Sequence, residues 1–151
     1  FSICESLGLK VIYDDKPLHP DYLLFGFYSP GNRTITIKKD AITHVENLMN
    51  FNQLHKLLPP FSFVDILLFH EIFHHLEDTT IEIYTRSKLV KSQFLGFIRK
   101  SSSLASASEI AAMVFSKKMA QISFHPSIFE WLLLWSYDKC PVVFYDTYML
   151  K

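Results

Sequence analysis

The segment HEIFHHLE, residues 70–77, places three histidines and two glutamates among Phe, Leu and Ile. In a helix each residue advances by about 100°, so His70 and His74 lie about 40° apart on one face. Two imidazoles at this spacing can bind one zinc ion, and Glu71 is held near the ion but too far away to replace its water. The segment therefore predicts a zinc site in which the metal activates a water and Glu71 takes its proton.

The alternative is a buried helix whose histidines are satisfied by ordinary hydrogen bonds. With seven histidines in 151 residues, a chance HExxH occurs in roughly one or two per cent of shuffled chains, so the motif alone does not decide. Burying several ionisable groups is costly unless something such as a metal pairs them. The apolar residues that surround the predicted helix therefore favour the metal: Phe63, Val64, Ile66, Leu67, Leu68, Phe69, Ile72, Phe73 and Leu76.

Two histidines leave the ion in need of a third protein ligand. A metzincin carries that ligand as a histidine six residues after the second one, and Thr80 at this position excludes the class. Glu77 lies on the same helix, where three ligands would crowd one side of the ion, and we expect an exposed helix-end acid there. Glu109 lies on a separate predicted helix, followed closely by two alanines that allow a close approach. The geometry favours Glu109.

Hydrolysis also needs a donor for the oxyanion and a place for the substrate. His75, Tyr84 and His125 are candidate donors, and each is equally an ordinary polar residue of a folded domain. The strand TITIK, residues 34–38, could offer its edge to an extended peptide. The alternative is an inner strand with both edges paired.

The first elements follow from turn and strand signals. Residues 1–8 predict the end of a helix stopped by glycine, and residues 9–15 a short strand. Residues 22–39 predict a hairpin whose SPGN turn suits type II, with Pro30 and Gly31 at its centre. In TITIK the isoleucines share one face and the polar residues the other, which predicts a half-buried strand.

The motif helix is preceded by another helix. Residues 40–58 carry apolar residues at helical spacing, with Asp40 as a candidate N-cap, and a Pro-Pro pair ends them. Ser62 and Asp65 resemble a capping box that opens the next helix. We expect this helix, which carries the whole HExxH motif, to run to about Asp78.

Signals are weaker after the motif helix. Residues 79–100 contain IEIYT, which could be a strand, and KLVKSQFLGFI, which could be a helix. SSSLASAS predicts a loop over residues 101–108, and a helix follows from about 106 to 122. Ser127 and Glu130 form a second capping-box pattern before the apolar helix IFEWLLLWSY. VVFYDTY predicts a closing strand.

These elements predict one α+β domain over residues 1–151, and the composition agrees, with 49% hydrophobic and 20% charged residues. A net charge of zero gives no field that attracts nucleic acid or anionic lipid. Cys4 and Cys140 form no CxxC pair and predict reduced thiols, with a terminal disulfide as the alternative. No apolar run reaches the ~20 residues that span a bilayer. We expect a cytoplasmic monomer or weak dimer, whose N-terminus before Phe1 could be missing.

HExxH on a buried helix, followed by Glu-x-x-Ala-x-x-Phe-Ser on a later helix, resembles the ImmA/IrrE family of gluzincin-type zinc metallopeptidases. The second motif consists of Glu109, Ala112, Phe115 and Ser116. ICESLGLKVIY resembles the opening helix and strand of the family, and GFYSPGNRTITI resembles its hairpin. The likeness covers about residues 1–120, and residues 121–151 predict a divergent C-terminal helix and strand.

The resemblance implies a small zincin-like fold and a bacterial or phage peptidase that cleaves a regulatory protein, such as a transcriptional repressor or an antitoxin. Carried over residue by residue, it implies zinc bound by His70, His74 and Glu109, with Glu71 as the catalytic base. Family members often carry Asn or Asp four residues after the ligand glutamate, where this chain has Met113.

A second hypothesis is a non-catalytic metal-binding module that binds a partner protein. Met113 and the apolar helix around Trp131 and Trp135 motivate it, although the two tryptophans could equally complete the core. A third hypothesis is a structural protein with core histidines and no metal.

Overall fold

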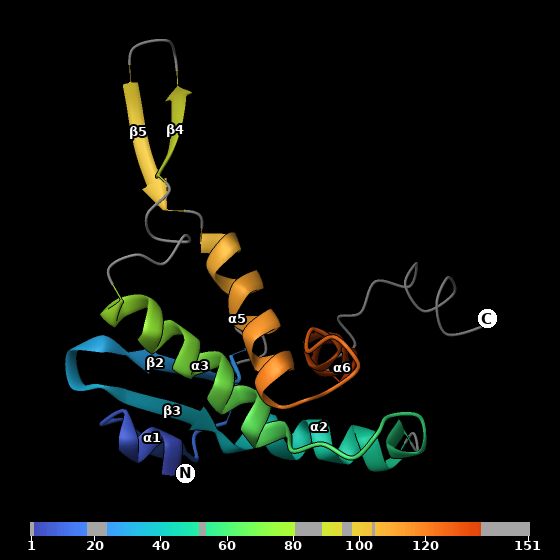
Figure 1. Cartoon of the computed structure of the whole chain (residues 1–151). Helices are drawn as coiled ribbons and strands as arrows, with labels where there is room; N and C mark the ends of the chain where they lie inside the picture. The colour runs from blue at the N-terminus through green and yellow to red at the C-terminus, as the bar shows by residue number, and fades with distance from the viewer. Residues whose placement is uncertain are drawn as a thin grey trace.

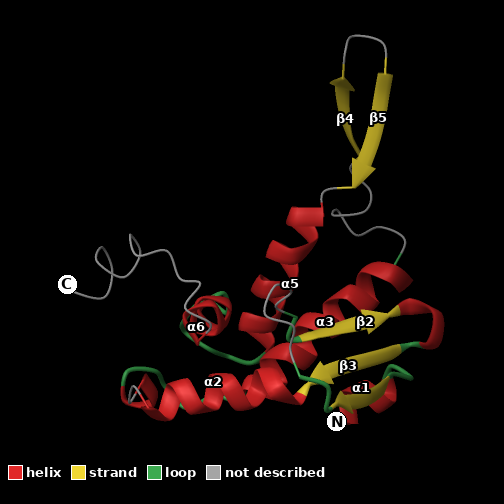
Figure 2. Ribbon diagram, turned by 180° about the vertical axis from the view of Figure 1, so that it is seen from behind, coloured by secondary structure: helices red, strands yellow, loops and turns green. Residues whose placement is uncertain are grey.

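The computed structural model describes residues 2–17, 24–51, 54–80, 89–94, 98–103 and 105–136. Its helices and strands are, in chain order, α1 (Ser2–Ser6), β1 (Lys10–Asp14), β2 (Gly26–Ser29), β3 (Thr34–Lys38), α2 (Lys39–Phe51), α3 (Phe63–Thr79), β4 (Leu89–Phe94), β5 (Ile98–Ser103), α5 (Ala105–Met119) and α6 (Ile128–Ser136). Two short 3-10 helices are added to these, η1 (Pro30–Asn32) and η2 (Leu54–Lys56). The predicted α+β class is confirmed. Figures 1 and 2 show α3 lying along the sheet beside β2, with α5 crossing α3.

The sheet has the strand order β1-β3-β2, with β1 parallel and β2 antiparallel to the central strand β3. Both edges of β3 are therefore paired, so the expectation that TITIK offers an edge to a peptide is wrong and the inner-strand alternative is confirmed. The expectation of a half-buried strand is also wrong, because Thr36 is buried like the isoleucines. The residues opposite Thr36 on the two neighbouring strands, Ile12 and Phe27, have larger side chains, which cover Thr36 from solvent.

The hairpin between β2 and β3 is confirmed, but its predicted type II turn is wrong. A type II turn needs a positive φ at Gly31, whereas the left-handed residue is Arg33, at φ 50°. Pro30 opens the 3-10 helix η1, and the Arg33 N–H donates to the Pro30 carbonyl at 3.3 Å. The predicted helix stop before β1 is confirmed at Gly8, which has φ 65°.

The motif helix α3 begins and ends close to the predicted residues. Ser62 is its N-cap, and the Ser62 hydroxyl accepts a hydrogen bond from the Asp65 N–H at 3.2 Å. The preceding helix α2 begins at Lys39, so Asp40 lies in its first turn and is not its N-cap. The reason is that β3 runs directly into α2 with no intervening residue, which leaves no room for a separate cap.

The segment after α3 differs from its prediction. Part of KLVKSQFLGFI forms β4 and not a helix, and residues 101–103 of the expected loop form the end of β5. The two strands pair antiparallel, Leu89 opposite Ser103 and Phe94 opposite Ile98. The two strands form a hairpin, but serine is not among the residues that favour strands, so the partner strand gave no β-rich signal of its own. The candidate strands IEIYT and VVFYDTY lie outside the described residues.

The hydrophobic core is shared by α3, the sheet, α2 and α6. Phe129 of α6 is 2% exposed, and its ring centroid lies 4.5 Å from that of Phe63 and 5.3 Å from that of Phe61. Leu132 and Leu133 are buried with it. The apolar helix α6 therefore contributes to the core of the domain, although through Phe129 and not through Trp131, which is half-buried.

Two further expectations concern the chain as a whole. Cys4 is a buried free thiol, and burial raises its pKa. Cys140, the other half of the alternative disulfide, lies outside the described residues. None of the described helices combines the length and the apolar character that crossing a bilayer requires.

Candidate metal centre

The HExxH motif lies in the middle of α3, where α5 crosses it. The crossing is close because the residues of α5 at the contact are small: Ala112 and Ser116 are both fully buried. Phe73 of α3 and Phe115 of α5 meet beside them with ring centroids 5.6 Å apart. This contact sets the N-terminal part of α5, which carries Glu109, over the histidines of α3.

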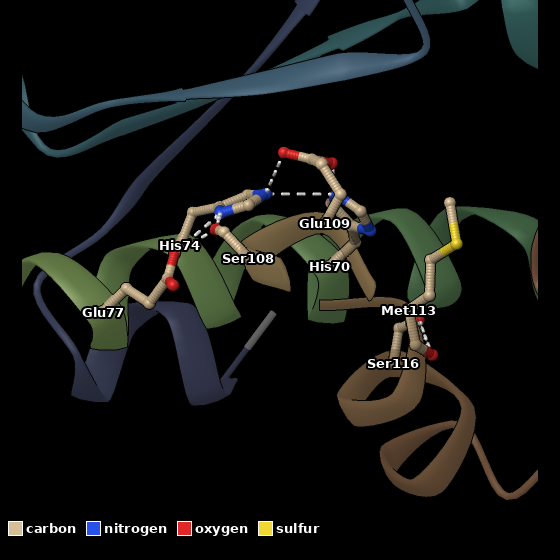
Figure 3. Close-up of polar contacts among 7 residues, drawn as sticks. All are labelled: His70, His74, Glu77, Ser108, Glu109, Met113 and Ser116. Atoms are coloured by element: carbon tan, nitrogen blue, oxygen red, sulfur yellow. Dashed lines mark hydrogen bonds and ion pairs between the residues drawn. The ribbon is translucent and has the colours of Figure 1, made fainter. Parts of the chain in front are cut away.

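The structure brings the three predicted ligands together. The Nε2 atoms of His70 and His74 lie 3.1 Å apart. The Glu109 carboxylate reaches both rings, with Oε2 at 3.3 Å from His70 Nε2 and Oε1 at 3.5 Å from His74 Nε2. Figure 3 shows the three side chains converging from the two helices. One ligand atom of each residue lies within 4.8 Å of the other two.

These separations fit a tetrahedral metal ion. Ligand atoms at about 2.0–2.1 Å from a tetrahedral centre are about 3.3 Å from one another. The two histidine Nε2 atoms, 3.1 Å apart, are close to that separation, and each of them lies 3.3 or 3.5 Å from a different oxygen of the Glu109 carboxylate. Two imidazole nitrogens and a carboxylate oxygen are also a donor set that zinc accepts. The Glu109 side chain is 56% exposed, so the group opens towards solvent on that side.

The electrostatics of the group attract positive charge. Burial opposes the charge on His70, but the Glu109 hydrogen bond and the nearby carboxylates of Glu71 and Glu130 outweigh it and raise the pKa of His70. The hydrogen bond from His70 lowers the pKa of Glu109 against the opposing effect of burial. Acidic side chains thus surround the histidine nitrogens, and a divalent cation can replace the proton that they favour.

Glu71 follows His70 in α3 and is close enough to His70, His74 and Glu109 for their charges to act on its pKa. It is 6% exposed, and the backbone N–H of Tyr28 in β2 donates a hydrogen bond to its carboxyl. Burial raises the pKa of Glu71, while His70 and His74 lower it. The net rise moves the pKa of Glu71 towards neutral pH, where a general base accepts protons most effectively.

Glu77 differs from its prediction, since it is not an exposed acid at the end of the helix. Its side chain is 3% exposed, and its Oε2 atom lies 3.2 Å from His74 Nδ1. The Ser108 hydroxyl donates a hydrogen bond to the same oxygen at 2.5 Å. The first turn of α5 lies against the end of α3 and covers Glu77, which the helical pattern of α3 alone does not reveal. Glu77 thus meets the nitrogen of His74 that faces away from the converging ligand atoms.

The two candidate oxyanion donors that the structure describes, His75 and His125, do not join this group. His75 is 4% exposed, and its Nδ1 lies 2.9 Å from the Tyr28 hydroxyl of β2, so its ring is committed to the contact between sheet and helix. His125 lies after α5, where its Nδ1 is 2.8 Å from the Ser127 hydroxyl. Tyr84 lies outside the described residues.

Sequence reasoning missed three residues near the centre. Tyr28 reaches Glu71 with its backbone and His75 with its hydroxyl. Ser108 reaches Glu77. Glu130, which the sequence presented only as a capping residue, is close enough to His70 and Glu109 that their charges act on its pKa, which burial raises. None of these three belongs to a metal-binding or catalytic motif, because their positions depend on how β2, α5 and α6 pack around α3.

The chain matches no family model, no curated protein and no solved structure. The likeness to the ImmA/IrrE family therefore rests on the two short motifs and the order of the elements around them.

Proposed function

We propose that this protein is a zinc-dependent peptidase of the HExxH type. The observation that carries the proposal is the convergence of His70, His74 and Glu109. The two Nε2 atoms lie 3.1 Å apart, near the edge length of a tetrahedral site, and each lies 3.3 or 3.5 Å from one oxygen of the Glu109 carboxylate. Glu71 lies between the two histidines in the sequence and supplies a buried carboxyl with a raised pKa. Ligands and base together form the donor set of a hydrolytic metal centre.

The chemistry assigned to the chain is the hydrolysis of one peptide bond. A zinc ion held by the three ligands supplies Lewis acidity, which acidifies water and polarises a carbonyl. Glu71 accepts a proton from the attacking water as the water oxygen bonds to the carbonyl carbon. The same proton then passes from Glu71 to the amide nitrogen as the C–N bond breaks, so the products are a carboxylic acid and an amine. The Tyr28 N–H, which bonds the Glu71 carboxyl, holds this base under β2.

The substrate we propose is an extended segment of another protein. The strand next to the motif helix is β2, which pairs with β3 on one side only among the described residues. An extended peptide could pair with the part of its other edge that the hydrogen bond from Tyr28 to Glu71 leaves open, and pass close to the converging ligands. In line with the motif resemblance, we propose that the substrate protein is a regulator such as a repressor or an antitoxin. We also propose that the peptidase acts in the cytoplasm as a monomer or weak dimer.

A metal-binding module without catalysis is the second candidate. One observation favours it: Ile110 and Val114, one turn apart on α5, are 60% and 42% exposed, next to Glu109. Exposed apolar side chains beside a metal site suit contact with a partner protein. The apolar helix α6 gives it less support than the sequence suggested, because Phe129 and Leu133 of that helix are in the core.

Metal analysis followed by a cleavage assay tests the proposal. Protein purified without added zinc should contain about one zinc per chain by elemental analysis, and a chelator should remove it. Candidate regulators are then incubated with the zinc-loaded protein, and cleavage is followed by mass spectrometry. Cleavage that stops on chelation and returns with zinc supports the peptidase. Zinc-dependent binding of a regulator without cleavage supports the second candidate, and protein that neither contains nor binds zinc contradicts both.

A further inference from the structure

A buried carboxylate lies behind the converging ligands. Glu77 is one turn beyond His74 on α3 and is 3% exposed, although it is near the end of the helix. Its Oε2 atom lies 3.2 Å from His74 Nδ1, while His74 Nε2 faces His70 and Glu109. The two nitrogens of one ring therefore have separate partners: Nδ1 meets a carboxylate, and Nε2 faces the candidate metal position.

Ser108 connects this carboxylate to α5. The Ser108 hydroxyl donates to Glu77 Oε2 at 2.5 Å and lies 3.4 Å from His74 Nδ1. Ser108 directly precedes Glu109, so neighbouring residues in one turn of α5 reach opposite ends of the His74 ring (Figure 3). The ring is thus held between the two helices, by Ser108 and Glu77 at Nδ1 and by Glu109 at Nε2.

This arrangement determines which nitrogen of His74 can bind a metal. A neutral imidazole carries one proton, and the other nitrogen keeps its lone pair. Ionised Glu77 can only accept hydrogen bonds, so it favours the tautomer with the proton on Nδ1. The lone pair then lies on Nε2, which faces His70 and Glu109. A carboxylate behind a ligand histidine also makes the imidazole a stronger metal ligand.

We propose that Glu77 is a positioning residue, which fixes the tautomer and orientation of His74 and thereby sets the zinc affinity of the centre. The inference deepens the proposed function and rests on its metal site. The resemblance leads one to expect a polar partner at position 113, where this chain has Met113. Its backbone carbonyl accepts a hydrogen bond from the Ser116 hydroxyl at 3.0 Å. Glu77 supplies a carboxylate partner from the motif helix itself, and Ser108 holds it there.

The first test measures zinc affinity by competition with a chromophoric chelator. Glu77→Leu, which is close to Glu in size and cannot accept a hydrogen bond, should weaken zinc binding by roughly 10–100-fold. Glu77→Gln should weaken it less, because its amide oxygen can still accept the Nδ1 proton. The matched control is Asp78→Asn, which alters the exposed neighbouring carboxylate and should leave the affinity within about twofold of wild type.

The second test requires no metal. Nitrogen-15 NMR of the imidazoles in the metal-free protein should show the His74 proton on Nδ1, and Glu77→Leu should move it towards Nε2. Thermal unfolding of each metal-free variant shows whether the fold is kept, and a loss of affinity or a tautomer change counts only in a variant that unfolds cooperatively. If Glu77→Leu fails this check, Glu77→Gln carries both measurements.

The outcomes separate the inference from the proposed function. Wild-type protein that binds no zinc contradicts the metal site, and the NMR measurement still decides whether Glu77 sets the His74 tautomer. If the wild type binds zinc, but folded Glu77 variants bind it equally well with an unchanged His74 tautomer, the inference is overturned and the peptidase proposal stands. Weaker binding together with a shifted tautomer supports the positioning role.

Discussion

Replacing Glu109 by alanine tests the metal centre most directly. Glu109 is the only member of the converging group that comes from α5, and its two oxygens lie 3.3 and 3.5 Å from the two histidine Nε2 atoms. Without it, the described group retains two ligands from one helix, which is one fewer than a catalytic zinc site uses. The zinc affinity of the variant should therefore fall by more than roughly 100-fold, which is the upper range for a residue that only orients a ligand. A 100-fold loss corresponds to about 2.7 kcal/mol of binding free energy.

The same substitution should scarcely change the stability of the metal-free fold. The Glu109 side chain is 56% exposed, and surface substitutions typically change the free energy of unfolding by within about 0.5 kcal/mol. The contact between α5 and α3 is made by other residues, including the buried Ala112 and Ser116. A loss of zinc in Glu109→Ala can therefore be separated from a loss of structure.

The assay is dialysis of zinc-loaded protein against a mild chelator, followed by elemental analysis of zinc per chain. The chelator is chosen so that it cannot strip a site weakened 100-fold. Glu109→Ala should then emerge without zinc, while wild type and Glu77→Ala retain it. Glu130→Gln is a matched control and should retain zinc. The charges of His70 and Glu109 act on Glu130, but Glu130 does not belong to the converging group. Retention by Glu109→Ala with loss from Glu77→Ala would show that Glu77, and not Glu109, is the third ligand.

Three further predictions address the base, the sheet and the core. Glu71→Gln should keep zinc but lower the rate of cleavage at least about 100-fold, since an amide cannot accept the proton of water; unchanged turnover removes Glu71 from the base role. Lys38 lowers the pKa of Asp14 below its ordinary 3.8, so the stability from this pair is present above about pH 3.8 and lost as pH falls through the lowered pKa. Asp14→Asn should therefore unfold at a lower temperature than wild type at pH 7, with the difference vanishing in acid; a difference independent of pH contradicts a stabilising ion pair between Asp14 and Lys38. Phe129→Ala should cost about 3–5 kcal/mol in urea unfolding, and a cost below about 1 kcal/mol would place α6 outside the core.

Features that depend on a few neighbouring residues were predictable from the sequence. The cap at Ser62 and the stop at Gly8 need only the residues beside them, and both are observed. The facing of His70 and His74 follows from the pitch of a single helix, so their Nε2 atoms meet without help from any other element. Alternating β-rich runs likewise indicated the hairpin of β2 and β3.

Features that depend on two elements meeting were decided only in the folded chain. TITIK has the same alternation whether one or both of its edges are paired, and the parallel contact with β1 makes it the central strand. Glu77 has the sequence position of an exposed helix-end acid, yet the approach of α5 buries it against His74 and Ser108. The local pattern of a helix defines its own faces, but not which of them another element will cover. Burial and charge at such a position therefore depend on contacts between residues far apart in the chain.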